Sequence, residues 1–154
     1  MGQYTPRIGS DPEYIKDLGQ AFYNFTYLEW GIIWLIAKLR PTYFTEIENA
    51  KPQKTAGRIR QDLVRSTAAS VAIDAPTRAK LVAIADRFGD MTRLRNLLLH
   101  AHPFTDQDGA QRLGGLSHGT RKTWTADEVQ EAARAFEEAA VEANDILHNH
   151  LNHL

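Results

Sequence analysis

The first forty residues carry apolar side chains at alternating steps of three and four positions, which is the spacing of one face of an α-helix. Asp11 followed by Pro12 is typical of a helix start, and Pro41 cannot continue the helix. We therefore predict a helix from about Asp11 to Leu39. Its main apolar face consists of Ile15, Leu18, Phe22, Phe25, Ile32, Ile36 and Leu39.

The opposite side of the same segment is also apolar. A helix that is apolar on two sides is commonly buried on both sides. In a chain of 154 residues, the second surface indicates a subunit interface as much as a core, so we expect a homodimer. This surface consists of Tyr23, Tyr27, Trp30, Ile33 and Trp34.

A second helical stretch is expected at roughly residues 52–71, and a third begins after Asp74. Pro76 stands in the first turn of the third stretch and Pro103 stops it, while Gly89 either kinks it or divides it into two helices. Apolar residues at helical spacing mark the buried sides of both stretches: Ile59, Leu63, Val64, Leu81, Ile84, Phe88, Met91, Leu94 and Leu98.

Residues 104–124 hold four glycines, which indicates a loop or a short hairpin. A last helix opens at Thr125, where Glu128 completes a capping box. Four helical stretches joined by short links predict a single all-α domain over residues 1–154. We expect an up-and-down bundle of four to five helices, with the glycine-rich loop or short hairpin before the last helix.

The composition narrows the classes of function. With 19 acidic and 18 basic residues the net charge is -1, so any contact with RNA must come from a local basic patch. The chain has no cysteine, which excludes thiolate metal sites and cysteine nucleophiles. Neither a secretory signal nor a membrane-spanning stretch is recognisable, so we expect a cytoplasmic protein without membrane contact.

The segment from Arg95 to His102 carries the strongest candidate chemistry. On a helix, Asn96 and His100 share a face because they are four residues apart, and Arg95 and His102, seven apart, nearly superimpose. Arg95 also falls on the apolar stripe of its helix, where a guanidinium is unfavourable unless an anion meets it. Glu29 holds a comparable position on the first helix.

Two interpretations of these residues remain open. In the first, Glu29 and Arg95 form a structural ion pair between two helices, and the histidines are ordinary residues of a last helical turn. In the second, the helix dipole favours protonation of the histidines, which suits general acid–base catalysis.

The hexapeptide Arg95-Asn96-Leu97-Leu98-Leu99-His100, at the end of a helix in a small bundle, resembles the HEPN superfamily. The hallmark of that superfamily is an arginine and a histidine separated by four to six residues, commonly with an asparagine directly after the arginine. The resemblance extends to the acidic residue within the first helix, the glycine-rich loop and the capped last helix. His102 also satisfies the spacing.

This resemblance implies a metal-independent endoribonuclease of a defence or toxin–antitoxin type system, which works as a homodimer with one composite cleft and no cofactor. His100, or alternatively His102, is then the acid–base group, and Arg95 holds the scissile phosphate. Asn96 orients the imidazole or contacts phosphate, and we include Glu29 in the candidate site. Cleavage leaves a 2′,3′-cyclic phosphate because the ribose 2′-oxygen is the nucleophile.

Four basic residues are candidates for RNA contact, with a solvated face as the alternative: Arg58, Arg112, Arg121 and Lys122. The competing interpretation is a non-catalytic helical module, because many HEPN proteins have lost activity. Such a module binds a nucleotide, or a nucleotidyltransferase or antitoxin partner. Three histidines at positions 148, 150 and 153 are more consistent with a frayed terminus than with a metal site, so we expect no metal.

Overall fold

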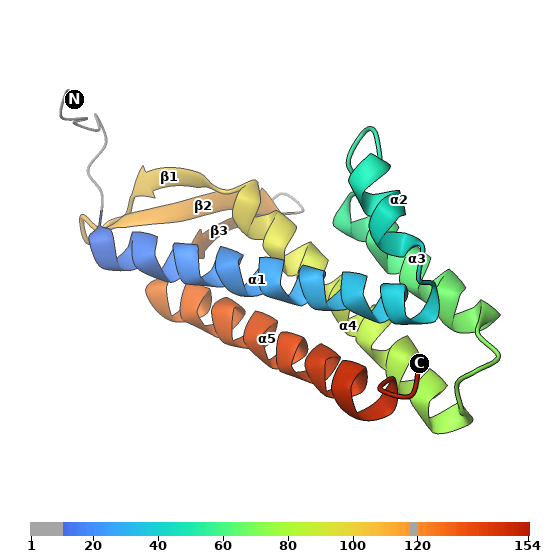
Figure 1. Cartoon of the computed structure of the whole chain (residues 1–154). Coiled ribbons are helices and arrows are strands. Elements are labelled where there is room, and N and C mark those ends of the chain that lie inside the picture. The colour runs from blue at the N-terminus through green and yellow to red at the C-terminus, as the bar shows by residue number, and fades with distance from the viewer. Residues whose placement is uncertain (1–10, 118–119) are drawn as a thin grey trace, which may run out of the picture.

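The computed structural model describes residues 11–117 and 120–154 and shows a helical bundle with one small antiparallel sheet (Figure 1). The predicted all-α class is confirmed. The elements, in chain order, are α1 (Pro12–Leu39), α2 (Tyr43–Asn49), α3 (Ala56–Ala69), α4 (Ala75–Leu99), β1 (His102–Thr105), β2 (Gln111–Ser117), β3 (Thr120–Trp124), α5 (Ala126–Asp145) and a π-helical turn, η1 (Ile146–His150).

Capping hydrogen bonds confirm three of the predicted helix starts. The Asp11 carboxylate accepts hydrogen bonds from two backbone N–H groups in the first turn of α1, at 3.1 and 3.2 Å. Asp74 caps α4 in the same way, and Thr125 and Glu128 form the reciprocal capping box of α5. Each cap satisfies backbone donors that a helix otherwise leaves without partners.

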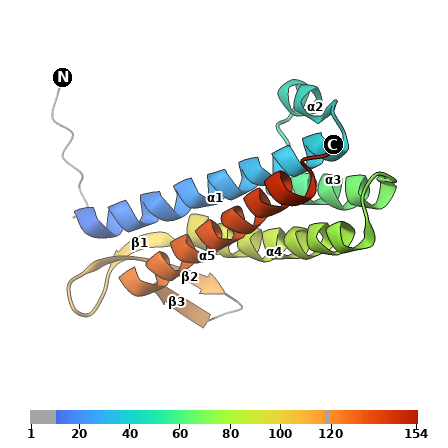
Figure 2. The ribbon, with the colours of Figure 1, turned by 60° about the horizontal axis from the view of Figure 1, so that its bottom comes forward.

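Helices α1 and α5 lie side by side and run in the same direction, while α4 runs opposite to both (Figures 1 and 2). Phe25 of α1 sits where these three helices meet. Its ring stacks on Phe88 of α4 at 6.0 Å between centroids and meets Phe136 of α5 edge to face at 5.4 Å. Farther along, Gly31 allows close packing of α5, because a Cβ at this position would lie 3.4 Å from the Cβ of Ala143.

Helix α3 lies within the stretch predicted for residues 52–71, and α2 is a short additional helix before it that the sequence pattern did not predict. Tyr43 of α2 donates a hydrogen bond of 2.9 Å to the buried Asp62 carboxylate of α3, and Lys54 donates one of 2.6 Å to the same oxygen. Burial raises the pKa of Asp62, but these two hydrogen bonds outweigh burial, so the pKa lies below its ordinary value. Contacts between elements, rather than local periodicity, therefore position α2.

Helix α4 is continuous through Gly89. The Arg60 side chain fills the space beside this glycine, since a Cβ there would lie 2.8 Å from the Arg60 Nε. Arg60 in turn donates hydrogen bonds of 2.8 Å to the Ala85 carbonyl and to the Asp86 carboxylate. Gly89 therefore makes room for an arginine rather than kinking or dividing the helix.

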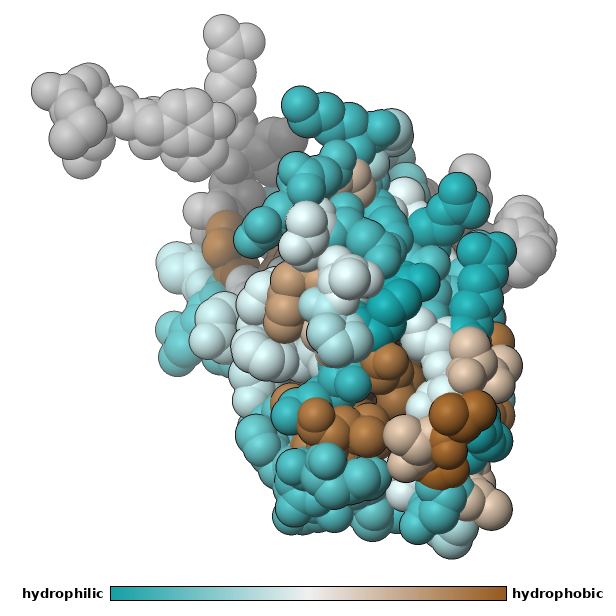
Figure 3. All heavy atoms as spheres, turned by 45° about the vertical axis from the view of Figure 1, so that its right-hand side comes forward, coloured by the Kyte–Doolittle hydropathy of each residue, from teal (hydrophilic) through white to brown (hydrophobic). Residues whose placement is uncertain are grey.

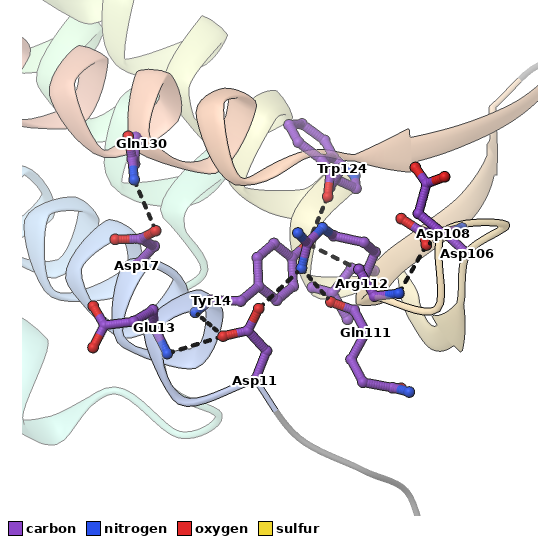
Figure 4. Close-up of polar contacts among 12 residues, drawn as sticks. Asp11, Glu13, Tyr14, Asp17, Asp106, Asp108, Gln111, Arg112, Trp124 and Gln130 are labelled. Atoms are coloured by element: carbon purple, nitrogen blue, oxygen red, sulfur yellow. Dashed lines mark hydrogen bonds and ion pairs between the residues drawn. The ribbon is translucent and has the colours of Figure 1, made fainter.

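The glycine-rich segment folds as a three-stranded antiparallel sheet with the order β1-β2-β3. The buried side chain of Tyr14 holds this sheet on α1 (Figure 4). Its hydroxyl donates a hydrogen bond of 2.8 Å to the Trp124 carbonyl and accepts one of 3.0 Å from the Leu113 N–H. One hydroxyl thus connects the first helix to two strands.

The chain end is packed against the bundle, so the predicted frayed terminus is wrong. Ile146, Leu147 and Leu151 are buried because η1 turns its apolar side chains inward. Figure 3 brings the side of the molecule with the C-terminus forward and shows hydrophobic side chains gathered in the lower part of that face. Across the two described ranges, no helix combines the length and apolar character needed to cross a membrane.

Replacing Tyr14 by phenylalanine should lower the free energy of unfolding by about 1–3 kcal/mol, because a buried carbonyl and a backbone N–H lose their partner. Urea unfolding followed by circular dichroism measures this change. Tyr23→Phe is the matched control and should change stability by less than about 0.5 kcal/mol, since the Tyr23 side chain is exposed. A Tyr14→Phe variant as stable as the wild type would show that other contacts hold the sheet.

Candidate functional site

The end of α4 presents two of the predicted site residues to solvent. The helix ends at Leu99, and the backbone N–H of His100 donates a hydrogen bond of 3.1 Å to the Asn96 carbonyl. Asn96 and His100 are both exposed. They stand one helical turn apart, in agreement with their four-residue spacing.

Arg95 lies half-buried between α4 and α1. Its guanidinium carbon is 4.5 Å from the centroid of the Phe25 ring, which is a cation–π arrangement. Its Nε is buried and makes no hydrogen bond to any described residue. Arg95 therefore keeps hydrogen-bond donors that the described part of the chain does not use.

The lack of such partners distinguishes Arg95 from the other half-buried arginines whose side chains the structure describes. Each of those arginines is hydrogen-bonded or ion-paired to a carboxylate or a carbonyl, as Arg60 is to Ala85 and Arg87 to Glu142. Buried guanidiniums are normally paired, because an unpaired charge in apolar surroundings is unfavourable. The paired residues are Arg40, Arg60, Arg78, Arg87 and Arg112.

Glu29 is half-buried on α1, one turn after Phe25. Burial raises the pKa of the Glu29 carboxyl, and the positive charge of Arg95 partly offsets the rise. Among the ion pairs of the described residues, none joins Glu29 to Arg95. The two groups therefore influence one another at longer range, and the structural ion pair considered from the sequence does not form.

Arg95 and His100 do not face the same direction within one protomer. Five residues of α-helix turn the chain by about 500°, which leaves the two side chains about 140° apart. The predicted superposition of His102 on Arg95 is wrong, because the helix ends before His102 is reached. His102 instead begins β1, where it is exposed and pairs with Gly114 of β2.

Arg112 on β2 is engaged where the sheet meets α1 (Figure 4). Its guanidinium carbon lies 4.8 Å from the centroid of the Tyr14 ring, and its Nη1 lies 3.3 Å from a carboxylate oxygen of Asp11. The backbone N–H of Tyr14 is the main cause that lowers the pKa of Asp11, and Arg112 lowers it further. Arg112 therefore helps to attach the sheet.

The other predicted RNA-contacting residues lie on separate elements. Lys122 on β3 pairs with Glu128 at 3.2 Å, whereas Arg58 is exposed on α3. Helix α3 and the sheet lie towards different ends of α1 (Figure 1). Arg121 belongs to β3, and its side chain lies outside the described part of the structure. Arg58, Arg112 and Lys122 do not form one free basic patch.

The C-terminal histidines are spread along the last turn and the chain end. His150 Nε2 lies 3.6 Å from an Asp145 carboxylate oxygen, and His153 lies 3.3 Å from the Ala72 carbonyl oxygen. Among the residues that the structure describes, no three metal-binding side chains are grouped closely enough to hold an ion.

A groove of about 350 Å³ lies between α1 and the C-terminal segment formed by the end of α5 and η1, and the sequence pattern did not bring its residues together. One wall comes from the predicted second apolar surface, where Tyr27, Trp30 and Trp34 are 48%, 49% and 40% exposed. Ile33 belongs instead to the core. The aromatic spacing was visible in the sequence, but the second wall depends on the parallel packing of α5. The groove is completed by Gly31, Lys38, Asn144, Leu147 and His148.

Comparison of the chain with models of protein families, with curated proteins and with solved structures gives no match. The features that bear on function are therefore the geometry around Arg95 and the groove beside α1.

Replacing Arg95 by methionine should raise the pKa of Glu29 above its wild-type value, because the lowering charge disappears while burial remains. An NMR titration of the Glu29 carboxyl carbon measures the pKa. Arg93→Met is the matched control, since it removes an exposed arginine of the same helix that pairs with Asp90, and it should leave the Glu29 pKa unchanged. If both variants left the pKa at the wild-type value, Arg95 and Glu29 would not be coupled.

Proposed function

We propose that the chain is a metal-independent endoribonuclease that acts as a homodimer in the cytoplasm, within a defence or toxin–antitoxin type system. Arg95 carries this proposal, because its half-buried guanidinium has no hydrogen-bond partner among the described residues. A guanidinium offers a planar fork of donors that suits phosphate oxygens. The exposed pair of Asn96 and His100 on the same helix end supplies the remaining groups that RNA cleavage needs.

In the proposed reaction, the ribose 2′-oxygen attacks the adjacent phosphorus and the bond to the 5′-oxygen breaks. The products are a 2′,3′-cyclic phosphate and a 5′-hydroxyl. His100 accepts the proton of the 2′-hydroxyl or donates one to the leaving 5′-oxygen, and water makes the complementary transfer. Arg95 stabilises the negative charge that develops on the phosphoryl oxygens, and Asn96 orients the imidazole or contacts phosphate.

A second copy of the chain completes the site in this proposal. Because Arg95 and His100 of one protomer point about 140° apart, Arg95 of one copy and His100 of the other would flank the same phosphate. Leu97 and Leu99 are 46% and 54% exposed beside His100, and a second copy would cover them. The aromatic surface of α1 faces away from Phe25 and Arg95, so we assign the dimer interface to the end of α4.

A non-catalytic binding module is the second candidate function, and the exposed aromatic wall on α1 favours it. Large apolar side chains that remain open on a surface commonly mark a binding site. In this alternative the chain binds a nucleotide, an antitoxin or a nucleotidyltransferase without cutting RNA.

Incubation of single-stranded RNA with the protein in EDTA tests the nuclease. We expect the wild type to leave 2′,3′-cyclic phosphate ends and to spare DNA of the same sequence, which lacks the nucleophile. His100→Ala and Arg95→Met should each reduce the rate by about 100-fold or more. Arg93→Gln is the matched control and should retain the rate, because Arg93 is exposed and pairs with Asp90.

A mixture of the inactive Arg95→Met and His100→Ala proteins should recover part of the activity if the site is composite, because one of the two sites in a heterodimer keeps both groups. Cleavage that needs a divalent ion, or that continues unchanged in Arg95→Met, would contradict the mechanism. If His102→Ala were inactive and His100→Ala remained active, His102 would be the acid–base group instead of His100.

A further inference from the structure

The groove between α1 and α5 is open, although aromatic rings form one of its walls. Trp30 and Trp34 stand edge to face, with ring centroids 6.3 Å apart and planes at 89°. Phe44 of α2 packs against Trp34 at 4.7 Å, and the Asn144 amide donates a hydrogen bond of 2.6 Å to the Tyr27 hydroxyl. Neighbouring side chains therefore hold this wall in place before any ligand arrives.

The groove also carries a positive charge that no described residue neutralises. Among the residues that the structure describes, its lining contains no carboxylate. Half-buried Lys38 forms no ion pair or hydrogen bond with the described residues, and the exposed His148 lines the other wall. Elsewhere on α5, Glu142 is paired with Arg87. A free ammonium beside partly exposed aromatic rings favours an anionic ligand over a cationic one, even though aromatic faces alone attract cations.

The size of the groove indicates a small molecule, since small-molecule sites commonly measure roughly 300–1,000 Å³. A base that stacks on an aromatic side chain gains about 1–3 kcal/mol, and lysine binds phosphate as a point charge. We propose that this groove binds a nucleoside monophosphate, with its base on Trp30 and Trp34 and its phosphate at Lys38. This site goes beyond the proposed nuclease and does not rest on it, because the groove lies on the side of α1 away from Arg95.

A second copy of the chain fits this groove less well. In an antiparallel pairing of two α1 helices about a two-fold axis near Tyr27 and Trp30, Lys38 of one copy would meet Gly19 of the other. The neighbouring Asp17 accepts a hydrogen bond of 2.9 Å from Gln130 (Figure 4). Such a dimer would therefore place a glycine, and no carboxylate, directly opposite the ammonium.

Titration of the whole chain with AMP, followed by tryptophan fluorescence and by equilibrium dialysis, tests the proposal. We expect saturable quenching by AMP, affinity for adenosine about tenfold weaker, and no quenching by inorganic phosphate. Lys38→Gln should remove the preference for AMP over adenosine, and Trp34→Leu should weaken the binding of both. Lys16→Gln changes an exposed lysine of the same helix and should leave the affinity for AMP unchanged.

Several results would overturn the assignment. They are the absence of saturable binding at millimolar AMP, equal affinities for AMP and adenosine, and unchanged AMP binding in Lys38→Gln. Tenfold tighter binding of a short DNA strand would reassign the groove to a nucleic-acid strand. A wild-type dimer in light scattering that becomes a monomer in Trp34→Leu would reassign it to a second copy. Each outcome is independent of RNA cleavage, so failure of one proposal leaves the other intact.

Discussion

The contact between the Arg95 guanidinium and the face of Phe25 is the constraint on which the candidate active site depends. Phe25 is itself fixed by Phe88 and Phe136 at the junction of three helices, so the core positions the arginine. A buried donor without a hydrogen bond typically costs about 1–3 kcal/mol, whereas a cation–π contact contributes about 0.5–2 kcal/mol. The ring of Phe25 therefore holds the guanidinium in place, while the buried Nε of Arg95 keeps no hydrogen-bond partner among the described residues.

Helix α1 separates two surfaces of different chemistry. Towards α4 it carries Glu29 and the ring that supports Arg95, and this flank is connected to the sheet through Tyr14. Its outer side carries the ordered pair of Trp30 and Trp34 beside α5. Because the two surfaces lie on different sides of one helix, the proposed ligand on the outer side would not block the proposed second copy at the end of α4.

Features that are set by residues close together in the chain were predicted from the sequence. They include the capped starts of α1, α4 and α5 and the position of Arg95 on the apolar face of its helix. It did not predict what depends on contacts between elements. Tyr43 is anchored by Asp62, nineteen residues later, and this contact holds α2, for which no periodicity was visible. His102 lies outside α4 because it belongs to β1, which pairs with β2. Lys38 lines a groove because the C-terminal segment packs alongside α1, and this contact between distant parts of the chain was not visible in the sequence.

The NMR signal of the Arg95 Nε–H group reports whether this guanidinium receives a phosphate. RNA with 2′-O-methyl groups has no nucleophile and should bind without being cut. As this RNA is added, we expect a saturable shift of the Arg95 signal and slower exchange of its proton with water, while the Arg93 signal stays in place. An Arg95 signal that does not move at millimolar RNA would contradict the claim that this guanidinium receives a phosphate.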